Sequence, residues 1–243
     1  MKSLNLFNRK APLHRARRTL TAWSAAALLG VTVIAASTVA SSAQASSDGN
    51  FGPVMGGRAY SIGISGTKVL NAPIPDGAGS DTGWVYSQGT AVFAPQCGNV
   101  NLGLVSATAA CAKVSTFSRS ESSVATTSLA TARVGVPGLP VIDVQAVNAT
   151  SFSKCFGEPS YGGSTTIAYL KVGTKVVIAK PTDIAPNTTL NLGVVSLTLN
   201  EQYSGDNGFT VNAIHVRANV PNVVTTNVIV SSATSSVGNC YLD

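Results

Sequence analysis

The sequence is poor in the residues that most enzyme active sites require. Beyond residue 45 it holds one histidine, His215, and none of its four cysteines forms a C-x-x-C pair. A serine hydrolase needs a nucleophile, an imidazole and a carboxylate, but no G-x-S-x-G motif is present, and G-x-x-x-x-G-K phosphate loops are absent too. A lone strand histidine is expected to be a surface or hydrogen-bonded residue. We therefore predict that the protein is not an enzyme and binds no metal or other cofactor.

Charged side chains are scarce, at 11% of the sequence. The six basic residues among the first 45 account for the whole net charge of +6. The rest of the chain, with ten basic and ten acidic residues, is neutral. A neutral domain lacks the basic surface that attracts nucleic acid or an anionic membrane. We predict neither kind of partner.

The N-terminal segment has the three parts of a secretory signal peptide. Its basic residues precede an apolar run at 19–40, and Ala43-Gln44-Ala45 supplies the small residues of a cleavage site. A run of this length could also span a bilayer, but its four polar residues and the Ala-x-Ala exit favour cleavage. Arg17-Arg18 leaves the twin-arginine route open beside the general one. We predict a cleaved bacterial signal peptide over 1–45 and a secreted, extracellular protein.

The remainder of the chain has the composition of strands joined by tight turns. Val, Thr, Ser, Ala, Gly and Asn dominate it, and no segment carries the apolar stripe of an amphipathic helix. Its length suffices for one domain with a substantial core. We predict a flexible lead over 46–56 and a single all-β domain, an antiparallel β-sandwich-like fold, over 57–243.

Period-two alternation places the first strand at 58–65. One face is predicted to hold Arg58, Tyr60, Ile62 and Ile64, and the other Ala59, Ser61, Gly63 and Ser65. Gly-Thr hairpin turns are predicted at 65–68 and 172–175, and a loop at 73–83. Further strands are predicted at 82–93, 100–108, 112–117, 122–134, 141–153, 164–172, 175–179, 189–200, 210–218 and 223–233. The alanines of 122–134 would also suit a helix, but its Ser and Thr content favours a strand.

An even number of cysteines in an exported chain indicates disulfides. Three pairings of the four cysteines are possible. We favour Cys97–Cys111, whose ends flank a short turn-and-strand unit, and Cys155–Cys240, which would tie the last strand to the middle of the chain. On the chain-entropy model these bonds contribute about 3 and about 4.6 kcal/mol.

Two sets of side chains are candidates for function. A glycosidase needs only two neighbouring carboxylates, and the glutamates are Glu121, Glu158 and Glu201, each expected to be a solvated or capping charge. Trp84 and Tyr86 share one strand face. If exposed, they form a surface aromatic site on which a sugar ring could stack; if buried, they belong to the core, which is the favoured reading.

Several segments are similar to the bacterial family called choice-of-anchor P. They are Gly57-Arg58-Ala59-Tyr60-Ser61-Ile62, Pro186-Asn187-Thr188-Thr189-Leu190, Leu197-Thr198-Leu199-Asn200-Glu201-Gln202, Thr210-Val211-Asn212-Ala213-Ile214-His215-Val216 and Val228-Ile229-Val230-Ser231-Ser232-Ala233-Thr234. The resemblance covers most of residues 57–240. It implies a secreted or surface-held domain and carries no activity or catalytic residue. The chain ends without an LPxTG motif or hydrophobic tail, so we expect release into the medium or non-covalent retention at the cell wall.

These observations favour a non-enzymatic extracellular domain with a structural or adhesive role at the cell surface. Its expected partner is cell-wall polysaccharide or another surface protein. The alternative is a secreted carbohydrate-active enzyme that uses paired carboxylates. A protease inhibitor acting through the Cys97–Cys111 loop is a third, less favoured reading.

Overall fold

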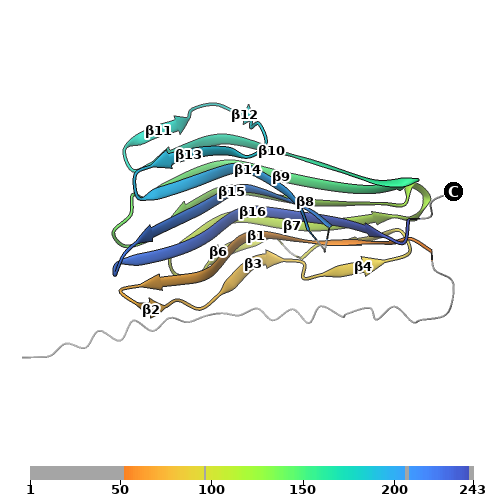
Figure 1. Cartoon of the computed structure of the whole chain (residues 1–243), viewed down its shortest axis with the longest axis horizontal. Coiled ribbons are helices and arrows are strands. Elements are labelled where there is room, and N and C mark those ends of the chain that lie inside the picture. The colour runs from red at the N-terminus through yellow and green to blue at the C-terminus, as the bar shows by residue number, and fades with distance from the viewer. Residues whose placement is uncertain (1–51, 96, 206–207, 241–243) are drawn as a thin grey trace, which may run out of the picture. The chain divides into compact units, whose positions relative to one another are not determined.

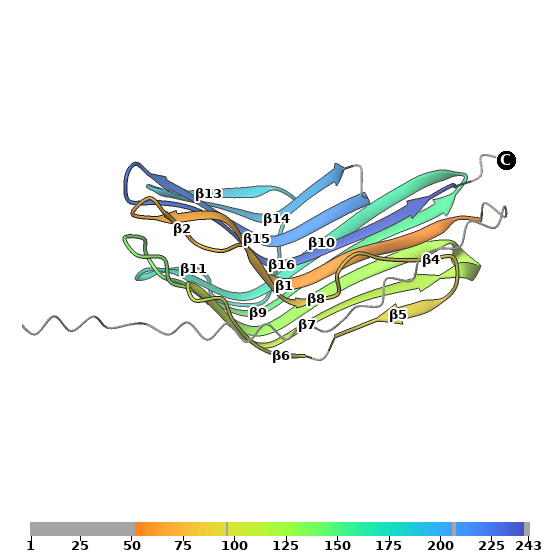
Figure 2. The same cartoon turned by 90° about the horizontal axis from the view of Figure 1, so that it is seen from below.

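The computed structural model of the protein describes residues 52–95, 97–205 and 208–240. The predicted signal peptide and most of the predicted lead lie outside these residues. The described chain forms two antiparallel β-sheets that pack face to face (Figures 1 and 2). It contains no α-helix, and its helical content is one 3₁₀ turn at Ser118–Ser120. The prediction of an all-β, sandwich-like antiparallel domain is confirmed.

Sheet A brings the two ends of the described chain together. Its strand order is β13-β14-β15-β16-β1, and β2, β3 and β4 pair with successive parts of β1. The N-terminal and C-terminal strands are therefore neighbours. The strands are β1 (Val54–Val69), β2 (Ala72–Pro73), β3 (Gly77–Asp81), β4 (Val85–Ser87), β13 (Thr188–Leu192), β14 (Val195–Gly205), β15 (Gly208–Val220) and β16 (Val224–Gly238).

Sheet B is a meander of four long strands with short strands at both edges. The order β10-β9-β8-β7 is bordered by β11 and β12 on β10, and by β5 and β6 on β7. The strands are β5 (Ala91–Phe93), β6 (Gly98–Asn101), β7 (Val105–Phe117), β8 (Ser122–Val134), β9 (Ile142–Phe156), β10 (Glu158–Val172), β11 (Lys175–Ile178) and β12 (Thr182–Asp183).

Both sheets are interrupted by one row of residues near the middle of their long strands, which we call the crease. In sheet A, for example, the ladder passes from the pair Tyr60–Ser232 to the pair Ile62–Val230 and omits the residues between them. Every second strand has a positive φ in this row. The crease comprises Asn200 (φ 48°), Ala213, Ser231 (65°), Ser61 and Ser80 (44°) in sheet A, and Ala109 (47°), Ala130, Ala146 (44°) and Ala168 in sheet B.

The crease exchanges the inner and outer faces of each strand. A left-handed residue breaks the alternation of side chains along an extended chain. On β1 before the crease, Ala59 is fully buried and Tyr60 points outward. After the crease the even-numbered residues Ile62 and Ile64 are the buried ones. The prediction that each set of alternate residues in 58–65 keeps to one face is therefore wrong, because each set passes from one face of the sheet to the other at Ser61. The strands also bend sharply at this row (Figure 2).

The crease separates two kinds of interior. Toward β2 and β11 the core consists of large aliphatic side chains, such as Leu170 and Leu197. On the other side it consists mainly of Ala, Ser and Thr. There, hydroxyl groups join the two sheets: Ser235 Oγ lies 2.7 Å from the Oγ atoms of both Ser151 and Ser153. Because a buried hydroxyl without a partner costs about 1–3 kcal/mol, these bonds make a polar interior tolerable.

Most predicted strands occur, with several corrections to their ends. The segment 122–134 is a strand, β8, as predicted, and the turn at 172–175 joins β10 to β11. Three predictions are wrong. Residues 65–68 form a bulge within β1 rather than a turn, because β16 still pairs on both sides of it. The predicted loop at 73–83 contains β3, and β1 starts at Val54, inside the predicted flexible lead.

Further boundaries differ because the sequence gives weak signals for short strands and for bulges. The strand predicted at 82–93 is divided into β4 and β5, which lie in different sheets. The strand predicted at 189–200 is a hairpin of β13 and β14. Conversely, 100–108 and 112–117 lie mainly on one strand, β7, which passes through the crease.

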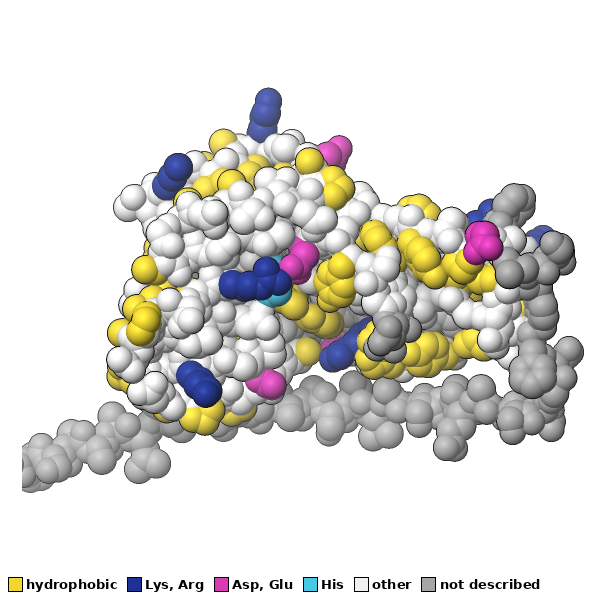
Figure 3. Space-filling view, viewed as in Figure 1, with side chains coloured by type: hydrophobic (Ala, Val, Ile, Leu, Met, Phe, Trp, Pro, Cys, Tyr) yellow, Lys and Arg dark blue, Asp and Glu magenta, His cyan; other side chains and the backbone are white. Residues whose placement is uncertain are grey.

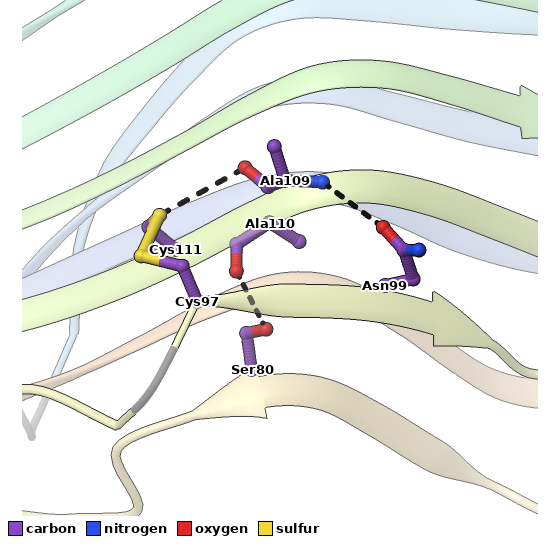
Figure 4. The surroundings of a disulfide bond; sticks show 6 residues. All are labelled: Ser80, Cys97, Asn99, Ala109, Ala110 and Cys111. Atoms are coloured by element: carbon purple, nitrogen blue, oxygen red, sulfur yellow. Dashed lines mark hydrogen bonds between the residues drawn. A yellow bond between two sulfur atoms is a disulfide. The ribbon is translucent and has the colours of Figure 1, made fainter.

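The favoured pairing of the cysteines is confirmed. Cys97 bonds Cys111 with a Cα–Cα distance of 4.4 Å, and Cys155 bonds Cys240 at 5.3 Å. Figure 4 shows the first bond beside the crease, where the Ser80 hydroxyl donates to the Ala110 carbonyl at 2.9 Å. The second bond joins the end of β9 in sheet B to the chain after β16 in sheet A. Each sheet is thereby fixed to the other near the C-terminus.

We predict that the two disulfides differ in their contribution to stability. Replacing Cys155 and Cys240 with Ala should lower the unfolding free energy by about 4–5 kcal/mol, because this bond closes the longer loop, 85 residues against 14. The matched pair Cys97→Ala and Cys111→Ala should lower it by about 3 kcal/mol. Urea unfolding of both double variants measures the difference. A larger loss from the Cys97–Cys111 pair would contradict the prediction.

We also predict that glycine is favoured at the crease. Ala146 is exposed with φ 44°, a conformation that costs an L-residue about 1–2 kcal/mol. Ala146→Gly should therefore raise the unfolding free energy by about 1 kcal/mol, and Ala146→Val should lower it. Asn148→Gly, two residues along the same strand and also exposed, is the control and should be destabilising. Equal losses from both glycine variants would show that Ala146 has ordinary strand conformation.

Candidate functional site

The outer face of sheet A is concave, because its strands bend at the crease toward this side (Figure 2). Figure 3 views this face and shows a histidine with basic and acidic side chains near its middle, and hydrophobic side chains to the right of them. The face therefore gathers two features, a charged cluster on β14 and β15 and a hollow with aromatic walls. Both lie at or next to the crease.

The charged cluster is centred on the Glu201 carboxylate. Its Oε2 atom lies 2.7 Å from His215 Nδ1 and accepts a hydrogen bond from Asn212 Nδ2 at 2.8 Å. Its Oε1 atom accepts a bond from Arg217 Nη2 at 2.7 Å. The Glu201 and His215 side chains are only 14% and 8% exposed. Glu201 was expected to be a solvated or capping charge, and this expectation is wrong.

His215 connects the cluster to the last strand. Its Nε2 atom bonds the Oδ1 atom of Asn227, whose amide nitrogen donates to the Ser65 hydroxyl at 3.0 Å. Both ring nitrogens thus have a side-chain hydrogen-bond partner, the Glu201 carboxylate on one side and the Asn227 amide group on the other. His215 is hydrogen-bonded, as expected for a lone histidine in a strand.

The environment of Glu201 holds it as an anion. Burial by itself would raise the pKa of the carboxyl group, but the hydrogen bonds from His215 and Asn212, the charge of His215 and the bond from Arg217 outweigh it. They lower the pKa of Glu201 from 4.5 to about 2. A carboxylate with both oxygens bonded in this way is poorly suited to donate or accept a catalytic proton near neutral pH.

Glu201 and Asp81 are also badly placed to act together as a glycosidase pair. Glu201 and Asp81 lie in one transverse row of sheet A, four strands apart, which corresponds to about 19 Å. Glycosidases need a separation of about 5–9.5 Å. Glu121 follows the 3₁₀ turn and Glu158 begins β10, both in sheet B. Neither lines the hollows of sheet A.

The second feature, which we call the aromatic hollow, has a volume of about 220 Å³. Three aromatic side chains and one basic side chain form its walls: Trp84, Tyr203, Tyr60 and Arg58. Its floor is a row of hydroxyl groups from Thr210, Ser232 and Thr234. Gly205 and Gly208 also line it. Trp84 and Tyr203 are 42% and 50% exposed. Such a hollow offers flat apolar surfaces above a floor of hydrogen-bonding groups.

The hydroxyl floor is ordered before any ligand binds. Thr210 and Thr234, opposite each other on β15 and β16, share a hydrogen bond of 2.9 Å. A hydrogen bond with Ser232 engages the Tyr60 phenol. Burial, the largest effect, raises the pKa of Tyr60 despite this bond, so the phenol stays neutral. Each hydroxyl retains lone pairs for a further partner.

Trp84 is positioned by a short segment anchored on β1. The Asp81 carboxylate binds Arg58 through two contacts, 3.0 Å from Nε and 2.5 Å from Nη2, and also accepts the Gly83 amide at 2.9 Å. The Thr82 hydroxyl accepts the Ala59 amide at 2.9 Å. Gly83, with φ 65°, then turns the chain so that Trp84 stands beside the hollow.

A second, larger hollow of about 440 Å³ adjoins the aromatic hollow. Arg58, Tyr60 and Asp81 line it, together with Asp76 and Ile229. Arg58 and Tyr60 line both hollows, and the Arg58 guanidinium lies 5.2 Å from the centre of the Tyr60 ring. The ring lies over Gly63, where a Cβ atom would come within 2.7 Å of it. Tyr60 therefore forms a low divider within one elongated groove.

Trp84 and Tyr86 are exposed, so the favoured expectation that they belong to the core is wrong. Their rings stack with a centroid distance of 6.2 Å and an interplanar angle of 6°. Gly56 makes room for Tyr86, because a Cβ atom there would lie 2.6 Å from the Tyr86 ring. The alternative prediction named Trp84, which lines the hollow, and Tyr86, which does not. It missed Tyr203 and the hydroxyl floor, which only the pairing of β14, β15 and β16 brings together.

Comparisons with known proteins add no further assignment: no family model, curated protein or solved structure matches the chain. The resemblance to the choice-of-anchor P family therefore stays a prediction. Within the described ranges, no three His, Cys, Asp or Glu side chains come together as a metal site would require. Among the same residues, no helix has the length and apolar character needed to cross a membrane.

The depressed pKa of Glu201 predicts a loss of stability in acid. A group whose pKa is lower in the folded state stabilises the fold above its ordinary pKa, and this contribution is lost as the pH falls from about 4.5 toward 2. Between pH 6 and pH 2.5, Glu201→Gln should lose less unfolding free energy than the parent protein, by on the order of 2–3 kcal/mol. Glu158→Gln, at an exposed position, is the control and should follow the parent protein. If the unfolding free energies of Glu201→Gln and the parent protein fell in parallel with pH, Glu201 would not be the source of the acid sensitivity.

Proposed function

We propose that the protein is a non-enzymatic extracellular domain that attaches to polysaccharide at the cell surface through the concave face of sheet A. The observation that carries the proposal is the aromatic hollow. Exposed aromatic rings gathered in one patch mark an interaction site more than single exposed rings do, and a sugar ring presents C–H groups to an aromatic face and hydroxyls to polar atoms. Trp84 and Tyr203 supply the rings, and Thr210 and Thr234 supply polar atoms.

The charged cluster supports a binding role over a catalytic one. The Glu201 side chain is only 14% exposed and lies on the same concave face, yet its oxygens are fully engaged by His215, Asn212 and Arg217. This arrangement stabilises the sheet next to the hollow. A hydrolase would instead need a carboxyl group that can exchange a proton during turnover.

Export is proposed from the N-terminal sequence and fits the two disulfides. Disulfides form and persist mainly in oxidising compartments, and both pairs of cysteines are bonded. The resemblance to the choice-of-anchor P family points in the same direction. We propose that the domain acts outside the cell, either released or held at the wall by non-covalent contacts.

Retention on cell-wall polysaccharide tests this function. We predict that the exported protein co-sediments with insoluble wall polysaccharide and that Trp84→Ala reduces the bound fraction about tenfold, because an aromatic contact contributes about 1 kcal/mol or more. Phe152→Ala is the matched control, since Phe152 is 44% exposed on sheet B and away from the hollow. In the control without polysaccharide, the protein should remain in the supernatant. Hydrolysis of the polysaccharide, or equal retention of the parent and Trp84→Ala, would refute the proposal.

A further inference from the structure

The geometry of the groove points to a definite class of ligand: we infer that the site binds a linear, uncharged glycan whose chain lies along β1 and spans Tyr60. This inference rests on the proposed function and adds the charge, the minimum length and the sugar configuration of the ligand. Each of the three follows from different residues on the concave face.

The charge of the ligand follows from the state of Arg58. Among the residues that the structure describes, Arg58 is the only basic one that lines either hollow. Its guanidinium is already engaged by Asp81, with both contacts at 3.0 Å or less, and the hydrogen bond to Asp81, the largest effect, raises the pKa of Arg58. An arginine engaged in this way has little capacity left for the two-point binding of an acidic sugar or a phosphate. Asp76 adds a second carboxylate to the larger hollow, which would repel such groups.

The length of the ligand follows from the groove. β1 runs beneath both hollows from Arg58 to Ser65, which corresponds to about 23 Å of extended chain. A single sugar ring fills only part of this length. An oligosaccharide can place one ring beside Trp84 and further rings past Tyr60, over Gly63 and Ile229. Short chains should therefore bind more tightly than the monosaccharide.

The sugar configuration follows from the two surfaces of the aromatic hollow. A ring whose hydroxyls are all equatorial suits Trp84 and Tyr203, because both of its faces present C–H groups that can stack on an aromatic ring. The edge of the same ring then presents equatorial hydroxyls to Thr210 and Thr234. Glucose-type β-1,4-linked chains have this shape, and they supply the probe.

Intrinsic fluorescence reports binding directly. The sequence contains two tryptophans, Trp23 in the predicted signal peptide and Trp84 in the hollow, so the exported protein has a single emitting indole. We predict that cellohexaose produces a saturable change in the emission of the exported protein, and that glucose binds at least tenfold more weakly. An oligogalacturonate of similar length should give no saturable change. Equal responses to cellohexaose and oligogalacturonate would overturn the uncharged assignment.

Variants separate the groove from other surfaces. Because Trp84 is the reporter, it is kept, and calorimetry confirms each affinity. Tyr203→Ala should weaken cellohexaose binding about tenfold, whereas Phe152→Ala, 44% exposed on sheet B, should leave it unchanged. Asp76→Asn should allow measurable oligogalacturonate binding. Near-ultraviolet circular dichroism verifies that each variant is folded, and loss of cellohexaose binding in Phe152→Ala would place the site elsewhere.

The outcome also distinguishes this inference from the function on which it rests. If the protein is retained on wall polysaccharide in a Trp84-dependent way but cellohexaose causes no response, the ligand class is wrong and the surface-binding function stands. If neither occurs, both fail.

Discussion

The crease is the constraint on which the rest of this structure depends. A left-handed residue on every second strand breaks the ladder at one row, and each strand exchanges its inner and outer faces there. The exchange lets one strand contribute Ala59 to the interior on one side and Ile62 on the other, while Arg58 and Tyr60 stay outside. The bend that accompanies it makes the outer face of sheet A concave. Without that bend, Tyr203, Tyr60 and Trp84 would stand on an open sheet surface rather than around a hollow.

Two different interiors hold the bent sheets together. Large aliphatic side chains bury apolar surface on one side of the crease, and this burial is the main stabilising term. On the other side, Ala, Ser and Thr leave little apolar volume, and hydroxyl bonds between the sheets, such as Ser151 to Ser235, replace part of it. The Cys155–Cys240 bond joins the sheets at the end of this less apolar half. The covalent bond therefore lies in the half of the domain whose interior is less apolar.

The sequence was sufficient for the class of fold and the cysteine pairing. Alternation of residue types and frequent turn residues predicted most long strands, including β8 at 122–134. It was not sufficient for the crease, because the residues there are Ser, Ala and Asn, which are common throughout the chain. Ser61 and its partner in the same row, Ser231, are both fully buried, and nothing in their local sequence marks them as interior positions.

The candidate site was predictable only in part. Trp84 and Tyr86 could be paired from their spacing, but their exposure depends on β4 lying at the edge of sheet A. Glu201, His215 and Arg217 come together because β14 and β15 pair in one register, placing residues 14 and 16 positions apart within hydrogen-bond distance. No pattern in the sequence fixes that register. Local patterns thus predict elements, and long-range pairing decides which side chains meet.

An amide chemical-shift map of ¹⁵N-labelled residues 46–243, recorded with and without a neutral β-1,4-glucan oligosaccharide, tests the central claim most directly. If the bent face of sheet A is the binding surface, the shifted amides will be those around Arg58–Ser65 on β1, Thr210 on β15 and Ser232–Thr234 on β16. Shifts confined to the outer face of sheet B, or no shifts at saturating oligosaccharide, would contradict the account.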